Sequence, residues 1–296
     1  MIKVFTFGGL GNQMFQYAAA RALANQLEVS VCIDKSFLNI YSKNTTPRNY
    51  ELDFFSLKHH DNVTSSKNMG RLFYKIYPKI KSTPFGKIIA AKYNLYDEKK
   101  EFNFDPNFFS LSDKTFLLGY FQSEKYFSPF EDDIRNCFVF KKHLSGKNAE
   151  IAEKIKSTNA ISIHIRRGDY VSNVKSMSIY AKKSSEYYEK AIDKIRQQVE
   201  NPVFFVFSDD PEEAKNIITA PETTFVDWNK GQDNYIDMQL MSLCKHNIIA
   251  NSSFSWWGAW LNNYAEKLVI APANWVNDEN KNNQIIDLIP EKWIRM

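Results

Sequence analysis

Apolar runs that alternate with helical patterns most limit what this chain can fold into. Residues 2–7 predict a strand, residues 8–11 a glycine-containing loop, residues 12–27 a helix and residues 29–33 a second strand. This order is typical of a parallel α/β sheet. The rhythm returns later in the chain, where helical patterns separate strands expected at residues 160–165, 203–207, 223–226, 247–250 and 268–271. The sequence therefore predicts the α/β fold class.

A chain of 296 residues is long enough for two domains of this kind. The lysine-rich segment 141–158 is a candidate boundary. We expect an N-terminal domain at residues 1–150 and a C-terminal domain at residues 151–296, whose final segment can pack back on the first. Residues 35–110 are less regular, and a helix is expected at residues 123–138.

Composition excludes some classes of function. The net charge of +4 is too small to indicate a nucleic-acid partner. No apolar run reaches the roughly 18 residues of a transmembrane helix, and the N-terminus lacks the pattern of a signal peptide. The cysteines have no metal-binding spacing and are expected to be reduced and mostly buried, namely Cys32, Cys137 and Cys244. These features favour the cytoplasm.

Paired arginines follow the strand expected at residues 160–165, in the segment 164–170 with the sequence His-Ile-Arg-Arg-Gly-Asp-Tyr. The planar guanidinium of arginine binds phosphate or carboxylate through two parallel hydrogen bonds and stays charged at any working pH. A site for a phosphorylated ligand is therefore one interpretation of Arg166 and Arg167. The other is that both arginines pair with nearby acids such as Asp169, because an unpaired charge is costly to bury.

The loop at residues 8–11 is a second candidate anion site, because a helix N-terminus presents free backbone amides. It is a poor dinucleotide fingerprint, since Met14 stands where that motif needs glycine or alanine. Asp34 at the end of the second strand keeps a nucleotide-dependent oxidoreductase as an alternative. A tight turn that requires glycine is the simpler interpretation. Asn12 can cap the helix or direct its amide at a ligand.

Polar residues also follow two later strands. Asp209 or Asp210 is expected to cap the helix that Pro211 begins. Residues 251–257 combine hydroxyls with a helix start, which makes a third candidate anion site, and their tryptophans are expected in the core. Asp237 lies in a mostly apolar helix, where its carboxylate can accept two N–H bonds from a base such as guanine or face solvent. The chain has no Asp-x-Asp pair for a metal, and strand-end anion sites in both halves suit a diphosphate held between two Rossmann-like domains.

Four segments occur here in the order in which they occur in one known family: residues 7–17, 164–170, 207–210 and 251–258. On these blocks the chain resembles the bacterial α-1,2-fucosyltransferases of glycosyltransferase family 11, a family that includes the animal blood-group H enzymes. The resemblance implies a GT-B-like fold of two Rossmann-like domains with a cleft between them. It also implies that L-fucose is transferred from GDP-β-L-fucose with inversion at the sugar and without a metal ion. GDP-β-L-fucose is then a co-substrate, and no cofactor is expected. The acceptor is expected to be the 2-hydroxyl of a galactose-terminated oligosaccharide or lipid-linked glycan, as in O-antigen.

The resemblance also implies roles for single residues. Arg166 is expected to bind the diphosphate, His164 the nucleotide and Asp237 guanine. Asn12 is expected to approach the diphosphate or the acceptor, and Asp169 is a candidate base or an anchor for Arg167. The remaining donor-binding residues, which face phosphate, are Ser252, Ser253 and Phe254. The N-terminal domain is expected to bind the acceptor and the C-terminal domain the donor.

Two other classes of function remain open on the sequence: a nucleotide-dependent oxidoreductase and a sugar-nucleotide-binding protein without catalysis. The cellular location of the protein is also open in one respect. Residues 67–100 hold nine basic residues against two acids, interleaved with aromatic and aliphatic residues. Such a stretch can contact the inner face of the cytoplasmic membrane peripherally. The alternative is an ordinary solvated helical face.

Overall fold

The computed structural model describes residues 1–40, 47–167 and 183–296 and divides into two compact units. The first comprises Met1–Lys141 and Ile285–Leu288, and the second Lys142–Gln284 and Ile289–Met296. The division falls before residue 150. No helix within the described ranges is both long and apolar enough to cross a membrane.

The first unit is built on a parallel sheet with the strand order β3-β2-β1-β5-β4. Its strands are β1 (Ile2–Phe5), β2 (Val31–Asp34), β3 (Asn62–Thr64), β4 (Leu95–Asp97) and β5 (Phe116–Leu118). Stacked aromatic rings of Phe5, Phe37 and Phe116 fill one face of the sheet. The strands β3 and β4 were not expected from the sequence, because β3 is exposed throughout and β4 is only half-buried, so neither has an apolar run.

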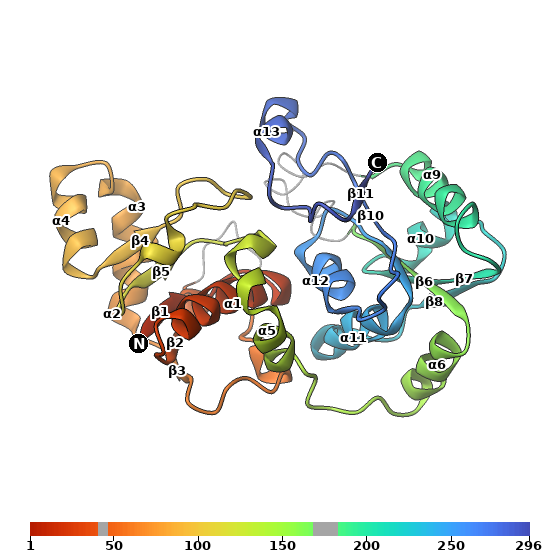
Figure 1. Ribbon diagram of the computed structural model, residues 1–296, viewed down its shortest axis with the longest axis horizontal. Helices are drawn as coiled ribbons and strands as arrows, with labels where there is room; N and C mark the ends of the chain where they lie inside the picture. Colours follow the sequence, from red (N-terminus) through yellow and green to blue (C-terminus); the bar gives the residue numbers. More distant parts are fainter. Residues whose placement is uncertain (41–46, 168–182) are drawn as a thin grey trace. The chain divides into compact units, whose positions relative to one another are not determined.

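Helices and turns complete the first unit. The long helix α1 (Leu10–Gln26) is almost entirely buried and follows β1 directly (Figure 1). The other helical segments are η1 (Ser36–Asn39), η2 (Leu52–Phe54), α2 (Lys67–Gly70), the π-helical η3 (Arg71–Ile76), α3 (Tyr77–Ile80), α4 (Pro84–Lys92), η4 (Phe108–Ser110), η5 (Glu124–Tyr126), η6 (Ser128–Phe130) and α5 (Glu131–Cys137). The single helix expected at residues 123–138 is therefore wrong. Pro129 lacks the N–H that a continuous helix needs there, and the backbone of Phe127 leaves the helical region.

The second unit is built on a six-stranded parallel sheet with the order β11-β10-β9-β6-β7-β8. Its strands are β6 (Asn159–Ile165), β7 (Pro202–Ser208), β8 (Thr223–Val226), β9 (His246–Ile248), β10 (Val269–Ala271) and β11 (Ile294–Arg295). Its helical segments are α6 (Lys147–Lys156), α9 (Ser185–Arg196), α10 (Pro211–Ile217), η7 (Gly231–Asp233), α11 (Tyr235–Leu243), α12 (Ser253–Leu261) and α13 (Glu279–Gln284).

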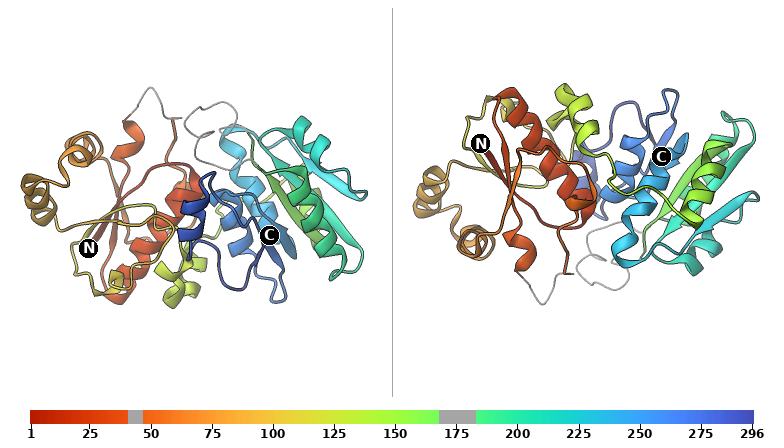
Figure 2. Two further views of the ribbon diagram at one scale, coloured as in Figure 1. Left: turned by 90° about the horizontal axis from the view of Figure 1, so that it is seen from above. Right: turned by 90° about the horizontal axis from the view of Figure 1, so that it is seen from below.

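Side chains of β6 alternate between the two faces of this sheet. Ile161, Ile163 and Ile165 pack with residues of α9 and α10, whereas Ala160 packs with residues of α6 and α11. The views from above and below agree, since α9 (green) covers one face and α6 (yellow-green) the other (Figure 2). His164 has the parity of Ala160 and therefore belongs to the face that α6 and α11 cover.

Candidate functional site

The candidate site lies at the carboxyl edge of the second sheet. The strand β6 is flanked by β9 and β7, and all three are parallel, so they end at the same edge. Ligands in open α/β sheets usually bind at this edge. The segments that follow the three strands hold the paired arginines, Asp209 and the start of α12.

Asp209 organises the paired arginines. Its Oδ1 accepts a hydrogen bond from the backbone N–H of Arg167 at 2.7 Å, and its Oδ2 lies 3.3 Å from Nε of Arg166. The Arg167 guanidinium pairs with Oε1 of Glu213 at 2.8 Å. The arginines therefore do pair with acids, but those acids come from the segment after β7 and from α10. Asp169, the acid expected from the sequence, lies outside the described residues.

The two arginines differ in how accessible they are. The side chain of Arg166 is 23% exposed, whereas that of Arg167 is 6% exposed. Arg166 can therefore reach a ligand in solution, while Arg167 is held inside by Glu213. One buried guanidinium nitrogen of Arg167 has no hydrogen-bond partner among the residues that the structure describes. We conclude that Arg166 is the candidate for anion binding and that Arg167 mainly supports the loop.

His164 is buried beside these arginines and is 4% exposed. Burial lowers the pKa of its imidazole to about 4, with a smaller opposing effect from the charge of Asp209. The ring is therefore neutral at physiological pH. Its Nδ1 has no hydrogen-bond partner, and the ring lies 5.7 Å from that of Phe254. A neutral, unpartnered ring nitrogen can exchange a hydrogen bond with a ligand without adding charge.

Helix α12 begins at this edge as the sequence predicts. Ser252 is its N-cap, and the hydroxyl accepts from the backbone N–H of Phe254 at 3.3 Å. Ser253 and Phe254 remain partly exposed at the helix start, where backbone amides favour an anion. The tryptophans of the helix are buried as expected, namely Trp256, Trp257 and Trp260. After the neighbouring strand β7, helix α10 has Asp210 as its N-cap. The Asp210 carboxylate accepts a hydrogen bond from the backbone N–H of Glu213.

Asp237 lies in the first turn of α11 and is partly buried. Its Oδ1 accepts from Nδ2 of Asn229 at 2.7 Å, and Asn229 is its one hydrogen-bond donor within the described ranges. Burial raises the pKa of this carboxyl to about 7, although the Asn229 hydrogen bond acts in the opposite direction. A carboxylate with one oxygen unused suits a ligand that presents N–H donors.

The residues that hold Asp237 in place were not predicted from the sequence. Asn229 and Asn148 exchange two hydrogen bonds, from Nδ2 to Oδ1 in each direction, at 2.8 and 3.1 Å. The indole N–H of Trp228 donates to the same Asn148 oxygen at 2.8 Å, and the ammonium of Lys147 lies 3.5 Å from the Trp228 ring centroid. We call Asn148, Trp228 and Asn229 the asparagine clamp. No sequence signal indicates it, because its members are some eighty residues apart and belong to no motif.

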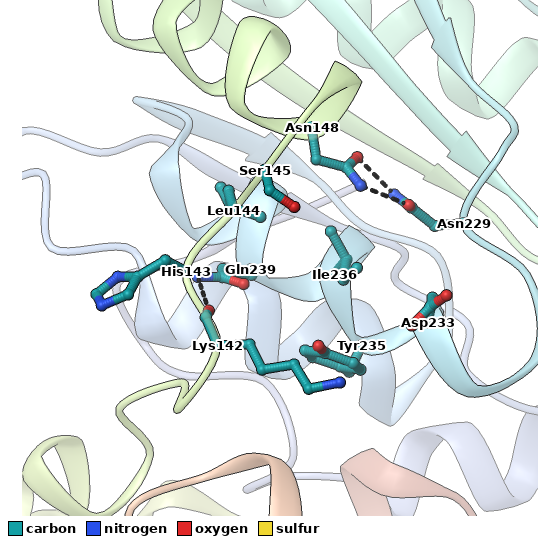
Figure 3. Close-up of a pocket in the computed structure, with 10 residues that line it drawn as sticks. All are labelled: Lys142, His143, Leu144, Ser145, Asn148, Asn229, Asp233, Tyr235, Ile236 and Gln239. Carbon is teal, nitrogen blue, oxygen red and sulfur yellow. Dashed lines mark hydrogen bonds between the residues drawn. The ribbon is translucent and has the colours of Figure 1, made fainter.

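A polar cavity of about 280 Å³ adjoins the clamp (Figure 3). Asn148 and Asn229 face each other at its border, and Gln239 lies beside the Lys142 backbone. The buried amide oxygens Asn234 Oδ1 and Gln239 Oε1 have no partner. The residues that line the cavity are Lys142, His143, Leu144, Ser145, Asn148, Asn229, Asp233, Tyr235, Ile236 and Gln239.

The glycine loop of the first unit, residues 8–11, differs from the site in the second unit because a side chain of the same chain occupies its helix start. Gly8 has φ of +79°, and a Cβ there would lie 2.5 Å from Nδ2 of Asn12, so the position requires glycine. The carboxylate of Glu51 accepts from the backbone N–H of Leu10, and Glu51 N donates to Gln13 Oε1 at 3.0 Å. The chain's own carboxylate thus occupies a helix start that the sequence offered as an anion site.

Asn12 does not cap α1, because it lies inside the helix. Its Oδ1 accepts from Nε2 of Gln122 at 2.7 Å, which fixes the orientation of the side-chain amide. The other polar residues named for the site belong to the second unit. Within the described parts of the chain, no cluster of three or more histidine, cysteine or acidic residues is arranged to hold a metal ion.

Comparison with known proteins agrees with this architecture. An alpha-1,2-colitosyltransferase of Escherichia coli is 37% identical over 295 residues, which cover 98% of this chain and 96% of that protein. The O-antigen biosynthesis glycosyltransferase WbnK of Escherichia coli is 35% identical over 303 residues, 98% of each chain. A galactoside alpha-(1,2)-fucosyltransferase 1 of Leontocebus fuscicollis is 27% identical over 154 residues, 49% of this chain and 42% of that protein.

Among solved structures, the fucosyltransferase NodZ from Bradyrhizobium matches with a TM-score of 0.50 and 14% identity, over 87% of this chain and 91% of that chain. The GT-B-like α/β fold expected from the sequence is thereby confirmed. The profile of the family described as glycosyl transferase family 11 matches residues 1–296. The four sequence blocks, the two parallel sheets and this full-length match lead to one conclusion: the chain belongs to glycosyl transferase family 11.

Proposed function

We propose that this protein transfers L-fucose from GDP-β-L-fucose to the 2-hydroxyl of a galactose-terminated acceptor, with inversion at the sugar. Relatives named as alpha-1,2-colitosyltransferase and as galactoside alpha-(1,2)-fucosyltransferase support this linkage, and a relative named as an O-antigen biosynthesis glycosyltransferase supports the class of glycan. We further propose that the acceptor belongs to a surface glycan such as O-antigen and that the reaction takes place on the cytoplasmic side. The first unit is the proposed acceptor-binding part and the second the donor-binding part.

The observation that supports this proposal most is the set of binding groups at the carboxyl edge of the second sheet. Guanine presents two neighbouring N–H donors on one edge, and Asp237 offers an oriented carboxylate with an unused oxygen. Arg166 offers a partly exposed guanidinium for a diphosphate. The start of α12, which holds Ser253 and Phe254, offers a helix N-terminus for the same charge. Together these groups match the two ends of a guanosine diphosphate.

The proposed mechanism uses these groups as fixed electrostatic stabilisers. Departure of GDP from C1 passes through an oxocarbenium-like state, and negative charge develops on the leaving diphosphate. Preorganised donors aimed at developing charge typically lower a barrier by several kcal/mol. Arg166 and the start of α12 supply such donors in this proposal, and His164 contributes a neutral contact to the nucleotide. No metal ion or cofactor is needed for this charge balance.

The proposal also assigns roles to Asn12 and Asp169. Asn12 is proposed to contact the acceptor or the diphosphate through Nδ2, because Gln122 already occupies its Oδ1. Asp169 is proposed as the base that deprotonates the acceptor hydroxyl, and it lies outside the described residues. Asp169→Asn would test that role through the pH profile of kcat.

A mass-spectrometric transfer assay tests the function directly. GDP-L-fucose is incubated with a panel of galactose-terminated oligosaccharides, and each is paired with an analogue whose terminal galactose lacks the 2-hydroxyl. We expect a mass gain of one deoxyhexose on the intact acceptors alone, undiminished by excess EDTA. Binding of GDP-fucose without transfer to any acceptor would indicate a non-catalytic binding protein, and tight binding of NAD(P) would indicate an oxidoreductase.

The 37% identical colitosyltransferase favours one alternative donor. Colitose is L-fucose without the hydroxyl at C3, so the two donors differ by one hydrogen-bonding group. A site that binds a hydroxyl discriminates strongly against the analogue that lacks it, whereas an apolar site discriminates weakly against the extra hydroxyl. Competition between GDP-L-fucose and GDP-L-colitose in the same assay would decide which sugar is the substrate.

A further inference from the structure

Large apolar side chains are exposed on one short helix of the first unit. In α4, Phe85 is 61% exposed and Ile88 is 63% exposed. They are three positions apart, so they lie on the same side of the helix. Ile76, at the end of η3, is 43% exposed. Single exposed apolar residues are common on protein surfaces, but a neighbouring pair on one helix face is more informative.

This exposure is not a sign of a poorly packed segment. The opposite side of the same helical region is anchored, because Phe73 and Tyr77 are buried against the stacked rings of the sheet. Ile89 and Tyr93 pack against the same cluster. Helices α3 and α4 lie beside each other in Figure 1. The region therefore presents an ordered amphipathic surface with one face in the core and one face outside.

The segment that contains α4, residues 67–100, carries charge of one dominant sign. All nine basic residues between positions 67 and 100 are exposed, and the stretch contains two acids, Asp97 and Glu98. One of the acids, Asp97, is paired with Lys81 at 3.0 Å. The exposed basic residues are Lys67, Arg71, Lys75, Lys79, Lys81, Lys87, Lys92, Lys99 and Lys100.

We propose that this surface, formed by Phe85, Ile88 and the surrounding lysines, docks the protein on an anionic lipid membrane. We call it the α4 surface. Amphipathic segments of this kind insert their apolar side chains at the boundary between headgroups and acyl chains while lysines contact anionic lipid. A nucleic acid would complement the lysines but would gain little from Ile88. The lipid surface is therefore the partner that fits both the apolar and the charged residues.

Vesicle sedimentation with the full chain tests the proposal. We expect binding to phosphatidylcholine vesicles that contain phosphatidylglycerol, little binding to pure phosphatidylcholine, and loss of binding at high salt. Phe85→Ser with Ile88→Ser should weaken binding by about tenfold or more, since both apolar anchors are removed. Charge reversal at Lys79 and Lys87 should weaken it at low salt. All variants should retain GDP-fucose binding, because none of these residues belongs to the proposed donor site.

Two matched controls separate the α4 surface from general effects. Ile286→Ser removes another strongly exposed apolar side chain, and the charge-reversal pair Lys190→Glu with Lys215→Glu alters exposed lysines of the second unit. Both controls should bind vesicles like the wild type. Phe85→Trp adds a direct readout, since its fluorescence should shift to shorter wavelength on anionic vesicles.

Three results would overturn the proposal. They are equal binding to neutral and anionic vesicles, wild-type binding by the Phe85→Ser, Ile88→Ser variant, or a dimer in solution that this variant dissociates. The last result would show that a second copy of the chain covers the α4 surface.

Discussion

The carboxyl edges of the two sheets carry similar sequence signals but use them differently. In the first unit, Glu51 fills the start of α1, and Gln13 donates to the backbone oxygens of Gly8 and Asn49. In the second unit, among the described residues, buried polar atoms of His164 and Arg167 have no hydrogen-bond partner, and Asp237 has an unused oxygen. The helix start of the first unit is therefore filled by the chain's own carboxylate, whereas in the second unit the described residues leave an oxygen of Asp237 available to a ligand.

This difference indicates that a glycine loop before a helix is weak evidence for a ligand-binding site. The same geometry that binds a phosphate also binds a carboxylate from the same chain. In the second unit, burial lowers the pKa of His164, which keeps its ring neutral, and raises the pKa of the Asp237 carboxyl to about 7. Such perturbed groups are more frequent at functional sites than elsewhere.

The largest expected effect is that of Arg166→Ala. Removal of a charged donor to the diphosphate should raise the transfer barrier by about 2–5 kcal/mol. Because the side chain is partly exposed, circular dichroism and thermal unfolding should stay near wild type. Arg196→Ala, at an exposed arginine of α9, is the matched control and should remain active. If Arg166→Ala keeps activity within a few-fold of wild type, the assignment of the donor site to the carboxyl edge of the second sheet is wrong.

The second prediction concerns the pH dependence of donor binding. Asp237 must be ionised to accept two N–H bonds, and its pKa in the free protein is about 7. The dissociation constant of GDP-fucose should therefore rise about tenfold per pH unit below this value and be constant above it. GDP-fucose has no phosphate group that titrates in this range, and His164 titrates lower. Calorimetry should give weaker, pH-independent binding for Asp237→Asn; an unchanged profile would exclude Asp237 from base recognition.

A smaller effect is expected for the asparagine clamp. Asn229→Ala removes the hydrogen bond that lowers the pKa of Asp237, so the midpoint of the binding profile should move to higher pH. At neutral pH the affinity should fall by about 1 kcal/mol and should largely recover in alkaline buffer. Asn216→Ala, at an exposed position of α10, should leave the profile in place. A uniform loss of affinity at all pH values would indicate a structural defect instead of a positioning role.

The smallest effect on function is expected in the first unit. Glu51→Ala removes the acceptor for the N–H of Leu10, so the free energy of unfolding should fall by about 0.5–2 kcal/mol. The affinity for GDP-fucose should stay within about twofold of wild type, since a carboxylate that caps a helix contributes stability and not donor recognition. Asp53→Ala, at a neighbouring exposed acid, is the control for stability. If Glu51→Ala instead weakens donor binding as strongly as Arg166→Ala, the contrast between the two edges is wrong.

Local patterns predicted a large part of the fold. The alternation of apolar runs and helical patterns placed β1, β6, β7 and β8 close to their observed bounds, because each depends on a few consecutive residues. The cap of α10 was also narrowed to Asp209 or Asp210, since a cap and its helix are adjacent in the chain. The short strands β3 and β4 were missed because β3 is exposed throughout and β4 is only half-buried, so neither has the apolar run of a core strand.

The sequence by itself determined the fold class, the family and the positions of Arg166, His164 and α12 at strand ends, because these follow from order and spacing along the chain. Only the tertiary structure decided which groups are already occupied. Asp209 and Glu213 are seen to pair with the arginines, Glu51 fills the first helix start, and Asn229 orients Asp237. Hydrogen bonds and burial depend on side chains that folding brings together from distant segments, so no local pattern records them.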